Sequence, residues 1–191
     1  MQRKEGLVHL LIGNGNGKTT SAVGIIVRAT GHGLKAALVQ FLKSGLSGEI
    51  FALKKLGVLV VSKTKFCPSQ QKHKAQLAKK GFVIFCKDCF AINESDRKLC
   101  RAAFSKAKRL CSSGKFDLVV LDEILWAISE GLIEESELLE LIKSRHPRCE
   151  LIITGRKASK KILQLADYIS EVKKIKHPFD NGIISRAGID Y

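Results

Sequence analysis

Residues 7–20 have the sequence Leu-Val-His-Leu-Leu-Ile-Gly-Asn-Gly-Asn-Gly-Lys-Thr-Thr, and they give the clearest indication of the fold class. Its first part, Leu7 to Ile12, is a short apolar run that predicts a buried strand of a parallel sheet. Lys18 to Thr30 then predicts a helix, because apolar residues recur at helical spacing at Ala22, Val23, Ile26 and Ala29. A glycine-rich segment between a strand and a helix is the context that a phosphate-binding loop requires.

The predicted phosphate loop comprises Gly13, Asn14, Gly15, Asn16, Gly17, Lys18, Thr19 and Thr20. Backbone N–H groups in such a loop, together with the N-terminus of the helix, attract the phosphates of a nucleoside triphosphate. Lys18 adds a full positive charge, and the hydroxyl of Thr19 can hold Mg²⁺. The strict pattern places a glycine six residues before the lysine, where this chain has Ile12. The loop is therefore a shortened variant, and a glycine-rich turn without a ligand is the alternative.

Segments typical of strands and helices alternate along the rest of the chain. We expect strands at 36–41, 58–61, 116–121, 150–154 and 168–172, and helices at 49–56, 95–111, 134–144 and 159–166. Ser95-Asp96 and Ser159 are the expected caps of two of these helices. The alternation predicts an α/β fold, a mostly parallel sheet with helices on both faces in three αβα layers. The loops that follow the strands then lie at one edge of the sheet, where ligands bind.

Two carboxylates, Asp122 and Glu123, follow the most apolar predicted strand. A carboxylate at this position, opposite a phosphate loop, is typical of Mg²⁺ coordination in nucleotide-binding proteins. The alternative is an ordinary strand end that runs into a helix cap. The five histidines are scattered, and no catalytic dyad, triad or Gly-x-Ser-x-Gly motif is evident.

The length of 191 residues fits one domain, which we expect to span 1–191. Hydrophobic residues make up 45% and charged residues 27%, as in globular proteins. No apolar run approaches the ~20 residues that cross a membrane, and the N-terminus has no signal-peptide pattern. These features predict a cytoplasmic protein without a membrane segment.

The formal charge is +15, from 33 Lys and Arg against 18 Asp and Glu. Such a surface favours polyanions, including triphosphates, acidic proteins and nucleic acid. Nucleic acid is the less favoured partner, because the basic residues are spread along the chain rather than concentrated in an arm. The pair Cys86 and Cys89 has the spacing of zinc ligands, but a structural zinc site usually needs four ligands, so reduced thiols are the preferred interpretation.

Several segments, which occur in the same order along the chain, resemble the ATP-dependent corrinoid adenosyltransferases that carry a phosphate loop. The resemblance runs from near residue 7 to the C-terminus, and the family's loop is short by the same one residue. The matching segments are 13–20, Arg28-Ala29-Thr30-Gly31-His32-Gly33, Val39-Gln40-Phe41-Leu42-Lys43, 116–123, Ile153-Thr154-Gly155-Arg156, Ala166-Asp167-Tyr168, Lys176-His177-Pro178-Phe179-Asp180 and Gly188-Ile189-Asp190-Tyr191.

The resemblance implies a P-loop NTPase-like (RecA-like) fold and transfer of the 5′-deoxyadenosyl group of ATP to Co(I) of a reduced corrinoid, with release of tripolyphosphate. It implies that Asn14, Lys18, Thr19 and Thr20 bind phosphates and that Thr19 and Glu123 hold Mg²⁺. It also implies Arg28 near the nucleotide, a homodimer, and an acidic flavoprotein as the reductant. Cobalt(I) is a nucleophile without a proton to lose, which accounts for a sequence without an evident general base.

The chain departs from the family after the third predicted strand, where many members have a Gly-Phe-Thr-Trp-type segment that packs near cobalt. Here the candidates for corrinoid contacts are Phe66, Phe82, Phe85 and Phe90, each of which is equally suited to a core. Two other functions stay open at this stage. One is a P-loop ATPase or small-molecule kinase, and the other is a nucleotide-regulated module that binds nucleic acid.

Overall fold

The computed structural model describes residues 5–43, 47–62, 69, 71, 75, 91–181, 186 and 188–190. Within this part of the chain, six parallel strands form one sheet in the order β3-β2-β4-β5-β1-β6. Their bounds are β1 Val8–Ile12, β2 Ala36–Gln40, β3 Leu59–Val61, β4 Leu118–Asp122, β5 Glu150–Thr154 and β6 Tyr168–Glu171. The prediction of an α/β fold with a parallel sheet is thus confirmed.

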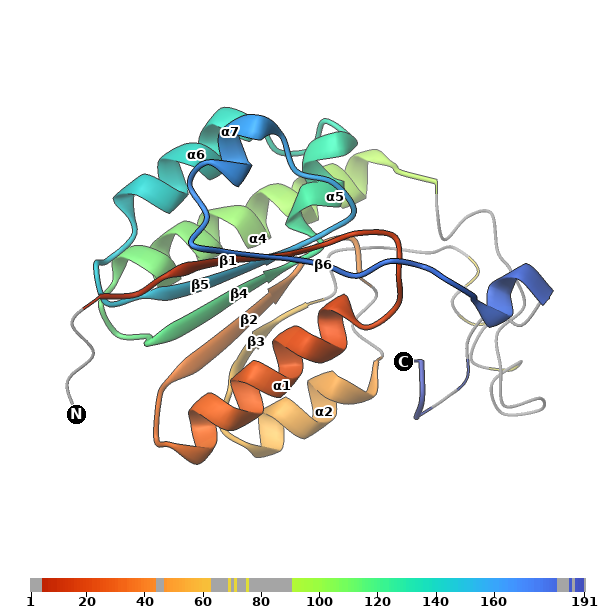
Figure 1. Cartoon of the computed structure of the whole chain (residues 1–191), viewed down its shortest axis with the longest axis horizontal. Coiled ribbons are helices and arrows are strands. Elements are labelled where there is room, and N and C mark those ends of the chain that lie inside the picture. Colours follow the sequence, from red (N-terminus) through yellow and green to blue (C-terminus); the bar gives the residue numbers. More distant parts are fainter. Residues whose placement is uncertain are drawn as a thin grey trace.

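Helices cover both faces of the sheet and complete three layers (Figure 1). The helices α1 (Lys18–Gly31) and α2 (Gly48–Lys55) lie on one face. On the other face lie α4 (Glu94–Ser112), α5 (Ile124–Ser129), α6 (Glu135–Ser144) and α7 (Lys160–Leu163). A 3₁₀ turn, η2 (Pro178–Asn181), follows β6.

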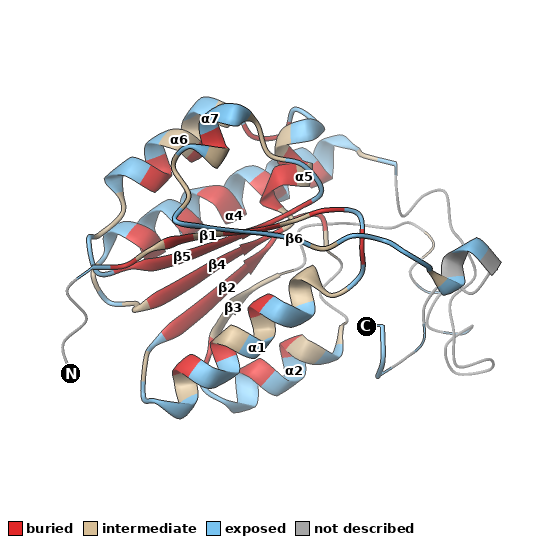
Figure 2. Ribbon diagram, viewed as in Figure 1, coloured by how far each residue is buried: buried red, intermediate tan, exposed pale blue. Residues whose placement is uncertain are grey.

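Burial follows the position of each strand in the sheet (Figure 2). Every residue of β2, β4 and β5 is buried, as expected for central parallel strands with helices on both faces. The edge strands differ, because β3 is half-buried and all four residues of β6 are exposed. The central strands therefore supply a rigid base for whatever follows their carboxyl ends.

Two apolar cores lie on opposite faces of the sheet. One packs Ala22, Ile26 and Ala29 of α1 against the sheet, which confirms the helical spacing seen in the sequence. The other contains Phe104 and Cys100 of α4 together with residues of α5, α6 and α7. Among the described residues, no helix combines the length and the apolar character that a membrane span requires.

Two expectations about the elements need correction, and one helix was not expected. The helix α4 is capped by Asn93 and not by Ser95, because the Asn93 side chain accepts a hydrogen bond from Asp96 N–H, and the Asp96 carboxylate accepts one from Asn93 N–H. The helix expected at 159–166 is only the single turn of α7, although Ser159 does cap it. The short helix α5 was not expected, because six residues are too few for a clear period.

Candidate functional site: a phosphate loop facing a buried carboxylate

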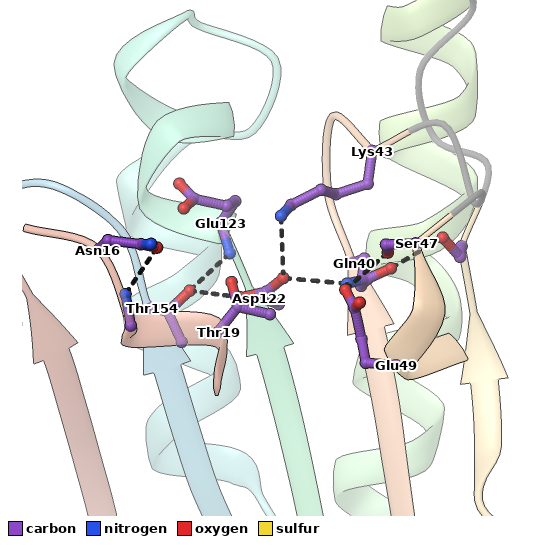
Figure 3. A network of polar contacts seen from close by, with 11 residues as sticks. Asn16, Thr19, Gln40, Lys43, Ser47, Glu49, Asp122, Glu123 and Thr154 are labelled. Carbon is purple, nitrogen blue, oxygen red and sulfur yellow. Dashed lines mark hydrogen bonds and ion pairs between the residues drawn. The ribbon is translucent and has the colours of Figure 1, made fainter. Parts of the chain in front are cut away.

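The predicted phosphate loop, Asp122 and Glu123 meet at the carboxyl ends of four neighbouring strands (Figure 3). The phosphate loop follows β1, Gln40 ends β2, Asp122 ends β4 and Thr154 ends β5. Register aligns these ends, because Gln40 pairs with Asp122 and Leu121 pairs with Ile153. The sequence prediction of one ligand-binding edge is therefore matched by the arrangement of the sheet.

The phosphate loop is held against the segments that follow β5 and β6. Gly13 N–H donates to the Arg156 carbonyl over 3.0 Å, and Gly15 N–H donates to the Val172 carbonyl over 2.7 Å. Both glycines are needed, since a Cβ on Gly13 would lie 2.3 Å from Val172 O and one on Gly15 would lie 2.8 Å from the same oxygen. Gly17 adopts φ of 108° at the N-cap of α1, which turns the chain into the helix.

Lys18 begins α1, so the N–H groups of Lys18, Thr19 and Thr20 have no acceptor inside the helix. The Lys18 ammonium donates to the Gly15 carbonyl over 2.8 Å, which places its charge over the loop. Burial lowers the pKa of Lys18 from its ordinary value, while the nearby Glu123 carboxylate opposes this shift. The loop thus offers a cation and free N–H groups in one place, which is what a polyphosphate chain requires.

Thr19 and Asp122 join the loop to the end of β4. The Thr19 hydroxyl donates to Asp122 Oδ1 over 2.9 Å, and Asp122 is fully buried. A hydroxyl has one proton and two lone pairs, so giving the proton to Asp122 leaves oxygen lone pairs available for a cation. Asp122 therefore orients Thr19 in the way that a Mg²⁺ ligand needs.

Asp122 is surrounded by donors on both oxygens. Oδ1 also accepts from the Thr154 hydroxyl over 2.8 Å, while Oδ2 accepts from Gln40 Nε2 over 3.2 Å and lies 3.9 Å from the Lys43 ammonium. Neutral donors and one cation thus stabilise a charge that would otherwise be costly to bury. Both oxygens of Asp122 thus have partners within the chain, and its coordination of Mg²⁺ stays a prediction.

Glu123 follows directly and has an unusual backbone, with φ of 60°. Its N–H donates to the Thr154 hydroxyl over 2.8 Å. Burial raises the pKa of the Glu123 carboxyl, and the charge on Asp122 raises it further, while Lys43 and Lys18 act in the opposite direction. Within the described part of the chain, this carboxylate makes no direct hydrogen bond or ion pair, so a divalent cation would complete its environment. Thr19 and Glu123 together fit the oxygen chemistry that Mg²⁺ prefers.

The other predicted phosphate ligands have local partners. Asn14 Oδ1 accepts from Lys174 N–H over 2.9 Å, and Asn16 Oδ1 accepts from Gly17 N–H. Asn14 and Asn16 are exposed within the loop, and Thr20 is exposed on the first turn of α1. Their binding of phosphates stays a prediction.

Arg28 is not brought to the loop within this chain. It is exposed in the last turn of α1, ten residues beyond Lys18, which is about 15 Å along a helix axis. Its role near the nucleotide is thus unsupported by the described residues. The candidates for corrinoid contacts, Phe66, Phe82, Phe85 and Phe90, and the pair Cys86 and Cys89, lie outside the described residues.

Four residues around the site were not among the predicted functional residues. They are Gln40 and Thr154, which contact Asp122, and Lys43 and Arg156, whose charges act on Lys18 and Glu123. Gln40 and Thr154 are each the last residue of a strand that is buried along its whole length, and a polar residue at that position is the signal that points to them. Lys43 and Arg156 each follow one of these strands by two or three residues.

Comparison with known proteins identifies the family of the chain. Over 191 residues the chain is 34% identical to the corrinoid adenosyltransferase of Escherichia coli K12, covering 100% of this chain and 88% of that protein. It is 33% identical, with the same coverage, to the corrinoid adenosyltransferase CobA of Salmonella typhimurium. The corrinoid adenosyltransferase of Pseudomonas aeruginosa is 31% identical over 97% of this chain and 82% of its own length. Residues 4–191 match the family described as ATP:corrinoid adenosyltransferase BtuR/CobO/CobP, and the chain belongs to that family.

Proposed function

We propose that this chain transfers the 5′-deoxyadenosyl group of ATP to the cobalt(I) of a reduced corrinoid. In this reaction the cobalt electron pair forms a bond to C5′, the C5′–O bond breaks, and tripolyphosphate leaves. The main observation behind the proposal is that Glu123 lies beside the phosphate loop residues Lys18 and Thr19. The chain also matches the adenosyltransferase family over residues 4–191.

The main task of the protein is to hold the leaving group and align C5′ with cobalt. Negative charge develops on the triphosphate as the C5′–O bond breaks, and preorganised donors stabilise that charge without reorganising. The free N–H groups at the start of α1 and the Lys18 ammonium are such donors. Cobalt(I) has no proton to lose, so this step requires positioning rather than a general base.

Mg²⁺ would be held by Thr19 and Glu123. When bound, it would neutralise part of the charge on the departing phosphates. Asp122 contributes by fixing the Thr19 hydroxyl, and Lys43 and Arg156 add positive charge around the same carboxylates.

Anaerobic incubation with ATP, Mg²⁺ and chemically reduced cobalamin or cobinamide tests the proposal. We expect the absorbance change that accompanies Co–C bond formation, together with one tripolyphosphate for each corrinoid converted. Release of ADP without a spectral change would instead show an ATPase or a kinase. A reaction without protein and a reaction without ATP serve as the controls.

A further inference from the structure

We propose that Thr154 is a positioning residue that fixes both carboxylates of the site through its hydroxyl group. Thr154 is the last residue of β5, and the four residues before it in that strand are also buried. It is fully buried although its hydroxyl is polar, and a buried hydroxyl requires partners. Its two partners are Asp122 and Glu123 (Figure 3).

The Thr154 hydroxyl is used in both directions. It donates its single proton to Asp122 Oδ1 over 2.8 Å and accepts the Glu123 N–H over 2.8 Å. Asp122 Oδ1 also receives the proton of Thr19. One oxygen atom of Asp122 therefore links the phosphate loop to the end of β5, and Thr154 extends this link to Glu123.

The backbone of Glu123 explains why this second bond matters. Glu123 has φ of 60°, a conformation that non-glycine residues rarely adopt and that surrounding contacts must hold in place. The bond from its N–H to Thr154 is such a contact. It sets the point from which the Glu123 side chain leaves the chain, next to Lys18 and Asp122. The hydroxyl of Thr154 thus orients the Glu123 carboxylate towards the cation site and the Asp122 carboxylate towards Thr19.

This inference rests on the proposed function for its catalytic meaning, but the arrangement itself concerns the binding of Mg²⁺ and ATP. Thr154→Val keeps the shape of the side chain and removes the hydroxyl, so both Asp122 Oδ1 and Glu123 N–H lose a buried partner. Thr154→Ser keeps the hydroxyl and removes only a methyl group, and it is the matched control. Loss of a group that orients a metal ligand typically weakens metal affinity or activity about 10- to 100-fold.

The first measurement is the binding of ATP without corrinoid, by calorimetry at several Mg²⁺ concentrations. We expect Thr154→Val to need about 10- to 100-fold more Mg²⁺ for half-maximal ATP binding, and Thr154→Ser to stay close to the unaltered protein. The second is adenosyl transfer at saturating Mg²⁺ and ATP, where a residual decrease in kcat of Thr154→Val would report misalignment within the filled site. Thermal unfolding of all variants shows whether each is folded, and Thr154→Ala replaces Thr154→Val if the latter is not.

Two outcomes would overturn the inference. In the first, the variant without the hydroxyl has the same Mg²⁺ dependence as the unaltered protein. In the second, Thr154→Ser is impaired as strongly as Thr154→Val, so that the methyl group and not the hydroxyl matters. If the unaltered protein binds Mg²⁺ and ATP but forms no Co–C bond, the proposed function fails while the calorimetric test of Thr154 still applies.

Discussion

Thr19 has one hydroxyl proton, and the group that accepts this proton determines where the oxygen lone pairs point. Asp122 accepts it, and Asp122 is itself held by Thr154 and Gln40. The orientation of Thr19 thus depends on two residues that need not touch any ligand. Loss of a residue that orients a metal ligand commonly lowers metal affinity or activity about 10- to 100-fold.

Lys18 is the residue whose loss should affect the reaction most directly. We expect Lys18→Ala to lower kcat/KM for adenosyl transfer by at least about 100-fold, because a preorganised positive donor to the leaving group is removed. Among the described residues, the side chain makes one hydrogen bond, to Gly15 of its own loop, so the melting temperature should change little. Activity assays and thermal unfolding measure the two effects, with the exposed Lys98→Ala on α4 as the control. Full activity in Lys18→Ala would show that phosphates bind elsewhere.

Glu123 should destabilise the metal-free protein at neutral pH. Burial raises the pKa of this carboxyl in the folded state above the unfolded value, so the folded state binds the proton more tightly. Stability from this residue is therefore greatest below the unfolded pKa and is lost as pH rises through the folded pKa. We expect Glu123→Gln to raise the free energy of unfolding at pH 8 in a chelator, with a smaller gain as pH falls towards about 4.3.

Urea unfolding at a series of pH values measures this gain. The exposed Glu140→Gln on α6 is the control and should show little change at any pH. A Glu123→Gln variant that is no more stable than the unaltered protein at pH 8 would contradict the prediction. Addition of Mg²⁺ should stabilise the unaltered protein more than Glu123→Gln, since the cation replaces the missing partner of the carboxylate.

At the scale of single elements, the phosphate loop depends on the segment that follows β6, the edge strand next to β1. Gly13 has φ of 117°, and a Cβ there would collide with the Val172 carbonyl. We expect Gly13→Ala to lower the melting temperature and to weaken ATP binding, because the loop must move away from the segment after β6. Gly24→Ala is the matched control, since Gly24 is exposed inside α1 with open space around it, and alanine should add about 0.5–1 kcal/mol to stability. Equal effects of the two substitutions would show that the contact between Gly13 and Val172 is not needed for ATP binding.

The start of α4 offers a second test at this scale. Asn93→Ala removes the side chain that accepts from Asp96 N–H and should lower the free energy of unfolding by about 1 kcal/mol. Ser95→Ala lies two residues further on, is exposed, and should change stability by only a few tenths of that amount. Chemical denaturation compares them, and a larger loss in Ser95→Ala would restore Ser95 as the cap.

Elements with a clear hydrophobic period could be predicted from the sequence, and those without one could not. The strand β4 and the helix α1 were predicted within two residues at each end, because apolar residues mark them continuously. The cap of α4 was misplaced because Asn93, Ser95 and Asp96 are all good caps, and only the backbone geometry selects one. The helix α5 depends on the left-handed turn at Glu123, which no local pattern announces.

At the scale of the whole molecule, the alternation of strands and helices in the sequence predicted the fold class. It also predicted the edge of the sheet at which the site lies. The loop, Asp122 and Glu123 were predicted because glycines with a lysine, and carboxylates, stand out directly after an apolar strand. Gln40 and Thr154 were missed as functional residues, since their role depends on strand order and register. The order β3-β2-β4-β5 makes β2 and β5 the neighbours of β4, and only this adjacency places an amide and a hydroxyl on either side of Asp122.

The anchoring of the phosphate loop also has a consequence for the biosynthesis of the protein. Within the part of the chain that the structure describes, β1 is the first strand, and its partners β5 and β6 are the last two strands to leave the ribosome. Asn14 and Gly15 then receive their contacts from residues 172 and 174, about 160 positions later. Contacts between residues so far apart in the chain slow folding, because a long loop must close before they form. A nascent chain that already contains every residue of the phosphate loop therefore cannot complete its nucleotide site until translation has passed β6.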